Sequence, residues 1–357
     1  MDEASLFFDF YGVSVDVQVD DAEVRRRVEN DFSHFQVDAL DQPASLQIRG
    51  SVAAPDYGLL PPLKAQVYSP RNICYPDGPL TYIDYFGKAL AIYDRERFSV
   101  EAASEDIHLL HEIIFLTMIS RVNEKLEDQG LHRVHALAVE SGGEAALFMM
   151  PSGGGKTTLA RKFLESDDDC RIVSEDSPII SSAGLVLPYP LRFGVVGEKP
   201  AGIAEHHLTY MRRMEFEPKY LISLDAFQGR IARAASEPRF LFLGDRTLGL
   251  DCVIHRVGFW MGLKSLMRHM VVGVGLYQGV EFILQSSSQD LLRGSGRFLS
   301  RLRRAVTLAR RSQVYALELG RDPQHNFETI QQFFLDQGFT RPKASTRNLS
   351  HFRDGGD

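Results

Sequence analysis

The stretch Ala146-Leu-Phe-Met-Met150-Pro-Ser-Gly-Gly-Gly155-Lys-Thr-Thr-Leu-Ala160 is the most informative part of the 357-residue chain. An apolar run typical of a strand comes first, a glycine-rich turn follows, and good helix formers come after it. Successive glycines let the backbone curl so that several N–H groups point at phosphate oxygens, and the following helix adds the positive end of its dipole. The order strand, glycine loop, helix predicts an α/β fold that binds a nucleotide.

Seven residues of this loop are expected to contact the nucleotide: Ser152, Gly153, Gly154, Gly155, Lys156, Thr157 and Thr158. Lys156 supplies a mobile cation for the β- and γ-phosphates, and the Thr157 hydroxyl is a predicted ligand of Mg²⁺. The usual phosphate loop begins with a glycine at the position that Met150 occupies here. A glycine-rich turn that happens to contain a lysine is the alternative, and the strand before and the helix after argue against it.

Two acidic residues and a histidine are expected near the loop. A short apolar strand, Arg171–Ser174, ends in Glu175 and Asp176. Carboxylates at the carboxyl end of such a strand fall where Mg²⁺ and the attacking nucleophile bind in phosphoryl transfer. His135 lies on the strand that precedes the strand of the loop. Structural roles are the alternatives: a helix cap or turn for the acidic pair, and an ordinary strand histidine for His135.

Together these segments resemble the HPr kinase/phosphorylase family and its kinase-like relatives. The likeness consists of His135-Ala-Leu-Ala-Val139, a Gly-Gly hairpin at 142–143, the phosphate loop and Ser174-Glu-Asp176. The histidine stands twenty-one residues before the loop lysine, as in that family. The resemblance implies a P-loop kinase domain of the HPr kinase / PEP carboxykinase type. It also implies that Glu175, in the place of an aspartate, is the base toward a protein serine and is aided by His135.

The resemblance further implies the ligands of the nucleotide and the metal. Thr157 and Asp176 would hold Mg²⁺, and Arg192, at the end of Pro188-Tyr-Pro-Leu-Arg192, would contact the nucleotide. Pro190 stands where the parent family has a metal-binding glutamate. The implied catalytic residues are His135, Lys156, Glu175 and Asp176. The implied protein is an ATP- and Mg²⁺-dependent serine kinase acting on a small protein or peptide, and a homo-oligomer is compatible with this function.

Hydrophobic patterns divide the chain into two parts. Valines at 13, 15, 17 and 19 alternate with polar residues, as in a half-buried strand, and further strands are expected over 46–52 and in a hairpin over 82–93. Apolar residues recur at helical spacing from Ile107 to Leu126, which predicts a long helix capped by Ser104. We therefore expect a small α+β N-terminal domain over 1–103, a P-loop domain over 104–340 with a bridging helix at 104–128, and a flexible tail over 341–357.

Composition narrows the class of protein. Hydrophobic residues make up 44% of the chain and charged residues 24%, as in ordinary globular proteins. The formal net charge of −7 argues against general nucleic-acid binding, because a phosphate backbone attracts positive surfaces. Three widely spaced cysteines, an acidic start and the lack of a long uncharged apolar run favour a cytoplasmic protein without a membrane segment.

Two further features and a rival function stay open from the sequence alone. Tyr220–Asp225 has the form of a Walker B strand, with an ordinary buried strand as the alternative. Seven arginines lie between Arg293 and Arg311 with no acidic residue among them. They suit a solvated helix face, a docking surface for an acidic partner or phosphate, or packing against an acidic patch of the same chain. The rival function is a non-catalytic nucleotide-binding module that controls the docking of a partner.

Overall fold

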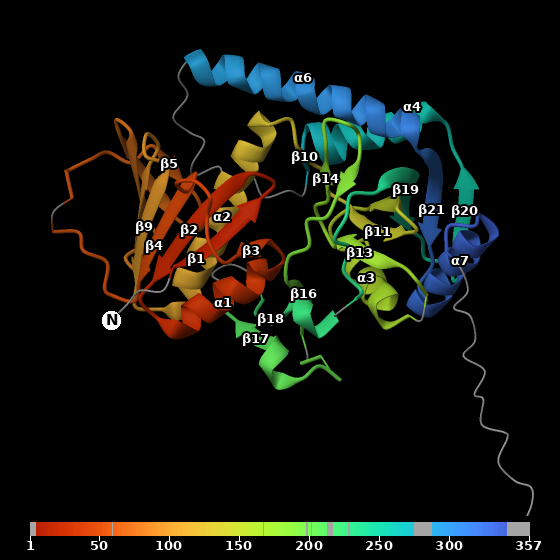
Figure 1. The fold of residues 1–357 in the computed structure, drawn as a ribbon, viewed down its shortest axis with the longest axis horizontal. Helices are drawn as coiled ribbons and strands as arrows, with labels where there is room; N and C mark the ends of the chain where they lie inside the picture. Colours follow the sequence, from red (N-terminus) through yellow and green to blue (C-terminus); the bar gives the residue numbers. More distant parts are fainter. Residues whose placement is uncertain are drawn as a thin grey trace, which may run out of the picture.

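The computed structural model describes residues 5–58, 60–166, 168–197, 199–200, 202–212, 217–227, 229–274 and 288–340, with the backbone alone for 288–295. The protein is a mixed α/β structure, as predicted. Figure 1 shows two parts side by side, with helix α6 (Ser288–Arg311) running across both. Residues 341–357, the predicted tail, lie outside the described residues. No helix in the described part of the chain is long and apolar enough to cross a membrane.

One mixed sheet forms the N-terminal part, with the strand order β3-β1-β2-β4-β9-β8-β7-β6-β5. Its strands are β1 (Leu6–Phe10), β2 (Val13–Val19), β3 (Gln36–Val37), β4 (Leu46–Ser51), β5 (Val67–Tyr68), β6 (Ile73–Asp77), β7 (Leu80–Asp84), β8 (Ala89–Asp94) and β9 (Ser99–Ser104). The alternating valines lie on β2, where every second side chain is buried, so the predicted strand is confirmed. The predicted hairpin is the antiparallel pair β7 and β8.

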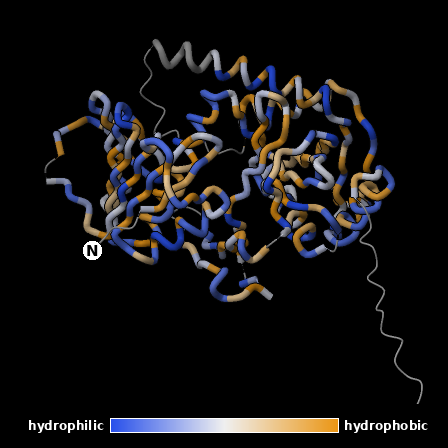
Figure 2. Tube along the Cα trace, in the orientation of Figure 1, coloured by the Kyte–Doolittle hydropathy of each residue, from blue (hydrophilic) through white to orange (hydrophobic). Residues whose placement is uncertain are grey.

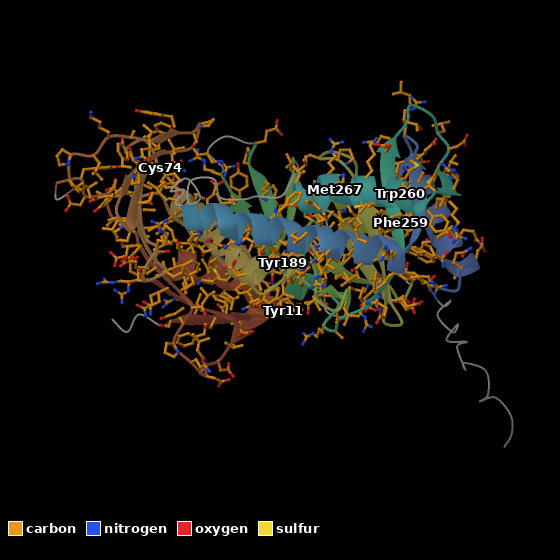
Figure 3. All side chains as sticks on the ribbon, turned by 90° about the horizontal axis from the view of Figure 1, so that it is seen from above. Tyr11, Cys74, Tyr189, Phe259, Trp260 and Met267 are labelled. Atoms are coloured by element: carbon orange, nitrogen blue, oxygen red, sulfur yellow. The ribbon has the colours of Figure 1, made fainter. Side chains whose placement is uncertain are left out.

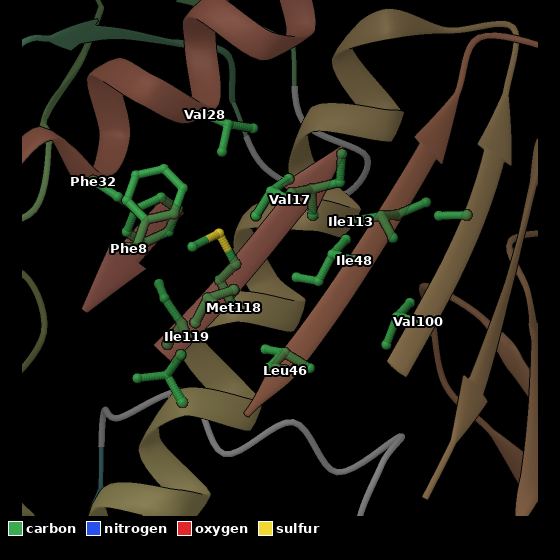
Figure 4. Close-up of a cluster of buried hydrophobic side chains, with 14 of the residues drawn as sticks. Phe8, Val17, Val28, Phe32, Leu46, Ile48, Val100, Ile113, Met118 and Ile119 are labelled. Atoms are coloured by element: carbon green, nitrogen blue, oxygen red, sulfur yellow. The ribbon is translucent and has the colours of Figure 1, made fainter. Parts of the chain in front are cut away.

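Two helices cover one face of this sheet: α1 (Ala22–Phe32) and α2 (Ile107–Asp128). Asp106 caps α2, because its side chain accepts from the amides of His108 and Leu109. The predicted cap, Ser104, instead ends β9 and donates its hydroxyl to Lys88 O. Figure 4 shows Ile113, Met118 and Ile119 of α2 packed among side chains of the N-terminal strands. We expected this helix to begin the second domain, but its apolar residues belong to the N-terminal core.

The second part is built on a six-stranded sheet with the order β13-β11-β12-β19-β21-β20. These strands are β11 (Leu137–Ser141), β12 (Glu144–Met149), β13 (Arg171–Ser174), β19 (Glu237–Arg246), β20 (Val253–Arg256) and β21 (Gln313–Leu319). Strands β12, β19 and β21 run parallel to one another. Their side chains alternate between two apolar cores, one on each face of the sheet. Figure 2 shows apolar residues concentrated inside both parts of the molecule.

Helices cover both faces of this second sheet. Helices α3 (Lys156–Glu165) and α7 (Pro323–Asp336) contribute to one core. Helix α4 (Phe259–Leu266), the π-helical turn η4 (Met267–Val271) and α6 contribute to the other. Figure 3 shows α6 lying beside α4 and η4, where Phe259 and Trp260 of α4 and Met267 of η4 are labelled. The phosphate loop therefore lies at the end of β12 in a sheet held between two layers of helices.

Two three-stranded sheets complete the described fold. One is β10 (His132–Arg133), β14 (Ile179–Ile180) and β15 (Val186–Leu187), and the other is β16 (Phe193–Val196), β18 (Lys219–Ile222) and β17 (Leu208–Met211). The segment Tyr220–Asp225, which has the form of a Walker B strand, begins within β18, and Asp225 lies in the short 3₁₀ turn after this strand. Since β18 pairs with β16 and β17 and not with the sheet of the loop, the Walker B interpretation is wrong.

Residues 188–192 join the two parts of the molecule. Tyr189 is 1% exposed and packs into the N-terminal core, with its ring 5.3 Å from that of Phe35. The hydroxyl of Tyr11 donates to Pro188 O, and Figure 3 labels Tyr11 and Tyr189. Arg192 forms a buried ion pair with Asp31 of α1. The chain that follows the acidic pair of the candidate site is therefore fastened to the N-terminal part.

Candidate active site

The topology of the second sheet brings the predicted residues to one edge. The phosphate loop follows the carboxyl end of β12, and Glu175 and Asp176 follow the carboxyl end of β13, which has the same direction. Strand β11 lies between them with the opposite direction, so its amino end is at this edge. His135 was expected on that strand, but it lies two residues before β11. The amide of Ala136 donates to Asp176 O over 3.1 Å and holds the two segments together.

The three glycines of the loop are needed for different reasons. Gly153 and Gly155 have φ values of +74° and +106°, in the left-handed region that suits glycine. Gly154 has no such angle, but a Cβ atom on it would lie 2.8 Å from Pro151 O and 2.9 Å from Met150 Cβ. Its amide donates to Pro151 O over 2.9 Å and closes the turn. The sequence Gly-Gly-Gly is therefore required by this conformation of the backbone.

Met150 is accommodated by a glycine on the neighbouring strand. The side chain of Met150 is fully buried in the core under α3 and α7. A Cβ atom on Gly244 of β19 would lie only 2.6 Å from Met150 Cγ. The Met150 carbonyl stays at the loop and accepts from Lys156 Nζ over 3.1 Å. The departure from the usual pattern thus adds a core side chain without removing this carbonyl from the loop.

Lys156 is the centre of the site. Its side chain is 7% exposed, and Nζ lies 2.8 Å from His135 Nε2 and 3.6 Å from Asp176 Oδ1. His135 Nε2 in turn lies 3.1 Å from Asp176 Oδ1, and the His135 side chain is 5% exposed. An imidazole nitrogen accepts from the ammonium in one tautomer and donates to the carboxylate in the other. The structure therefore brings together three of the four predicted catalytic residues as a cation, an imidazole and a carboxylate.

The two acidic residues lie in different electrostatic surroundings. Burial raises the pKa of the Glu175 carboxyl above its ordinary value, and the charge of Asp176 adds to this, while the hydrogen bond from Thr157 opposes it. Burial also acts to raise the pKa of Asp176, but the hydrogen bond and charge of His135 and the charge of Lys156 outweigh it and lower the pKa. Asp176 is thus the residue held ionised, and Glu175 is the one closer to protonation.

Oxygen donors suited to magnesium lie beside the loop. The Thr157 hydroxyl donates to Glu175 Oε1, whereas we expected it to share a metal with Asp176. Within the described ranges, no three His, Cys, Asp or Glu side chains are grouped as a metal site. Mg²⁺ beside a nucleotide is typically held by one or two carboxylates, phosphate oxygens and water. One hydroxyl and two carboxylates at the loop fit that ligand set.

His269 also lies at this edge, although no motif around it in the sequence indicates a function. The amide of His135 donates to His269 O over 2.9 Å, and the two imidazole rings are 5.6 Å apart. Burial, with the charge of His135 second, lowers the pKa of His269 to about 4. His269 belongs to η4, and the amide of Val272, the residue after this turn, donates to Met267 O five residues back. Single π turns are often found at functional sites, but this one has no sequence signature that we recognise.

Arg192 was expected to contact the nucleotide, but the structure gives it other partners. Its guanidinium is paired with Asp31, lies 3.2 Å from His111 Nε2 and stacks 3.5 Å above the Phe115 ring. All these partners belong to the N-terminal part. Ser152 and Thr158 are both exposed at the loop, where a phosphate could reach them. The described contacts of Arg192 support a structural role.

The arginine-rich segment forms much of α6, and it packs against acids of the same chain. Arg297 contacts Glu124 and Asp128, and Arg301 contacts Glu127, all near the end of α2. Arg304 and Arg311 donate to the carbonyls of Ser182 and Ala183. Arg303 and Arg310 are exposed, and the side chain of Arg293 lies outside the described residues. Of the three interpretations, packing against an acidic patch is the one that these contacts bear out for Arg297 and Arg301.

No protein-family model matches the chain, and no curated protein matches it. We therefore infer the function from the geometry of the loop and of the side chains around it.

Proposed function

We propose that this protein is an ATP-dependent phosphotransferase that transfers the γ-phosphoryl group to a hydroxyl, and that the acceptor is a serine of a small protein or peptide. The observation that carries this proposal is the cluster at the loop. Lys156 Nζ lies within 3.6 Å of both His135 and Asp176, and Thr157 is bonded to Glu175. A glycine loop alone supports nucleotide binding, whereas the half-buried carboxyl of Glu175 beside it also supports acid–base chemistry.

Lys156 is the residue that stabilises charge in the proposed reaction. Its present partners are a neutral carbonyl, an imidazole and one carboxylate. Bound phosphates would compete for the same ammonium, and they carry more negative charge than Asp176 alone. An ammonium directed at the transferring oxygens stabilises the charge that they gain in the transition state. The N–H groups of the loop and the amino end of α3 act on the same oxygens.

Glu175 is the proposed general base. A base works best when its pKa is close to the working pH, and burial moves the pKa of Glu175 in that direction. In the transfer step the acceptor oxygen bonds to the γ-phosphorus while the bond from phosphorus to the β–γ bridging oxygen breaks. The hydroxyl proton passes to Glu175, and ADP leaves. Asp176, held ionised by its neighbours, is less basic and is the better carboxylate for a cation.

The resemblance implies Mg²⁺ as well, and the oxygens of Thr157 and Asp176 would hold it. A bound Mg²⁺ supplies positive charge to the phosphate oxygens. The residues around it orient the nucleotide and receive the proton.

The proposal is tested with γ-labelled ATP, Mg²⁺ and a mixture of serine-, threonine- and tyrosine-containing peptides and small proteins. We expect label in an acid-stable phosphoester on serine, and we expect Lys156→Ala to abolish the transfer. A non-catalytic nucleotide-binding module would bind ATP in calorimetry and transfer no label to any acceptor or to water. That result would replace the proposed function with the rival one.

A further inference from the structure

Helix α6 contacts the candidate active site indirectly, at two neighbouring residues. Ser300 Oγ lies 2.7 Å from Nε2 of His132, three residues before His135. Arg301 donates to Val271 O over 3.0 Å, at the end of η4. Both contacts are made to segments that position His135. Ser300 contacts the residues that precede His135 in the chain, and Arg301 contacts the turn η4, whose His269 carbonyl accepts from the His135 amide. These residues are on the arginine-rich helix, which the proposed function does not use.

The other end of the Arg301 guanidinium is anchored on α2. Its Nη2 atom lies 2.5 and 2.6 Å from the two carboxylate oxygens of Glu127. The Arg301 side chain is 23% exposed and that of Glu127 is 15% exposed. Ion pairs with this degree of burial are screened less by solvent than exposed pairs. One planar guanidinium thus joins α2 of the N-terminal part to η4 of the second part.

The turn η4 connects Arg301 to the candidate active site. Its residues include Met270 and Val271, which are buried against Ala305 and Leu308 of α6 in one apolar core. The carbonyl of His269, within the turn, accepts from the amide of His135. A π turn leaves carbonyls without the usual helical partners, and a basic side chain at the end of a helix satisfies such groups. Arg301 supplies that contact at Val271.

We propose that Arg301 is a positioning residue: through Val271 and the π turn, it fixes the His135 backbone so that its imidazole meets Lys156 and Asp176. The kinetic part of this inference rests on the proposed function, and the spectroscopic part does not. Arg297 offers a matched control, because it also pairs with α2 through Glu124 and Asp128 but has no described contact with η4.

The experiment compares Arg301→Met with Arg297→Met in the full chain. Misplacing a catalytic group by about 1 Å reduces turnover by up to about 10²-fold. We expect Arg301→Met to lower kcat about 10-fold while the Kd for MgATP stays within about twofold. Arg297→Met should leave both unchanged. In parallel, NMR follows the imidazole resonance of His135, which is assigned by its absence from the spectrum of His135→Gln. This resonance should shift in Arg301→Met and keep its position in Arg297→Met.

Thermal melts followed by circular dichroism show whether each variant folds. If Arg301→Met does not fold, Arg301→Lys replaces it, because a single ammonium cannot hold both Glu127 and Val271 in the same way. The same two changes are then expected, at smaller size. A folded Arg301 variant with the wild-type His135 resonance would overturn the inference. Absence of transfer by the wild-type protein would overturn the proposed function alone, since the resonance would still report the positioning.

Discussion

The pairing of Met150 with Gly244 makes a prediction about stability that needs no assumption about function. In Gly244→Ala the new Cβ atom would lie 2.6 Å from Met150 Cγ and 3.3 Å from Met150 Sδ. Ordinary contacts begin near 3.5 Å, so the methionine must move by roughly 1 Å in a core where it is fully buried. Overpacking of this kind lowers the free energy of unfolding by about 1–3 kcal/mol.

A double-mutant cycle identifies Met150 as the cause. Met150→Ala alone should lower the free energy of unfolding by about 2–5 kcal/mol, because it opens a cavity. In that background the clash is gone and the added methyl group fills part of the cavity, so Gly244→Ala should be neutral or stabilising. Urea denaturation of the four proteins measures the coupling. Equal effects of Gly244→Ala in both backgrounds, within about 0.5 kcal/mol, would refute the reasoning.

The same chemical change at Gly296 serves as a control. Gly296 lies in α6, is exposed and has no atom within 4 Å of an added Cβ. An alanine inside a helix is favoured over glycine by up to about 1 kcal/mol. Gly296→Ala should therefore stabilise the protein, in contrast to Gly244→Ala.

Three other predictions concern ionisable side chains that are partly or fully buried. Asp31→Asn should lower the free energy of unfolding by about 3–5 kcal/mol in chemical denaturation, because it leaves the Arg192 guanidinium buried without its carboxylate. Thermal stability should fall as the pH drops from 6.5 towards 4. Burial lowers the pKa of His34, His132 and His269 to about 4 in the folded protein, so the unfolded chain binds protons at these histidines first. A melting temperature that stays constant over this pH range would contradict the prediction. The pKa of Glu175 is raised in the folded state, so the unfolded chain releases the Glu175 proton at lower pH than the folded protein does. The wild-type protein should therefore lose stability relative to Glu175→Gln as the pH rises above the ordinary glutamate range. Thermal melts of the two proteins at matched pH values measure this difference.

The local features of the loop could be predicted from the sequence because neighbouring residues determine them. The apolar strand before the loop, the glycines and the helix after it are all in place, from Glu144 to Glu165. The topology then brought the acidic pair and His135 to the same edge, as the order of strands suggested. The predicted cap of α2 was wrong, because Asp106 and Ser104 are both good capping residues and only the length of β9 decides between them.

Features that depend on distant pairs could not be predicted. Nothing near Met150 indicates that Gly244 makes room for it, because β19 lies far along the chain. The arginines of α6 and the acids of α2 are each visible, but their pairing requires the two helices to meet in space. Arg192 illustrates the same limit: the resemblance implied a contact with the nucleotide, whereas its partner Asp31 comes from α1. The π turn around His269 likewise depends on packing under α6.

The central claim is that the loop and its acidic pair perform phosphoryl transfer with Glu175 as the base. Single-turnover transfer from labelled ATP, measured for the wild-type protein and Glu175→Gln at equal nucleotide occupancy, tests it most directly. We predict that Glu175→Gln binds MgATP with wild-type affinity and transfers the label about 10²–10⁴-fold more slowly, the usual effect of removing a general base. Equal transfer rates at equal occupancy would contradict the account.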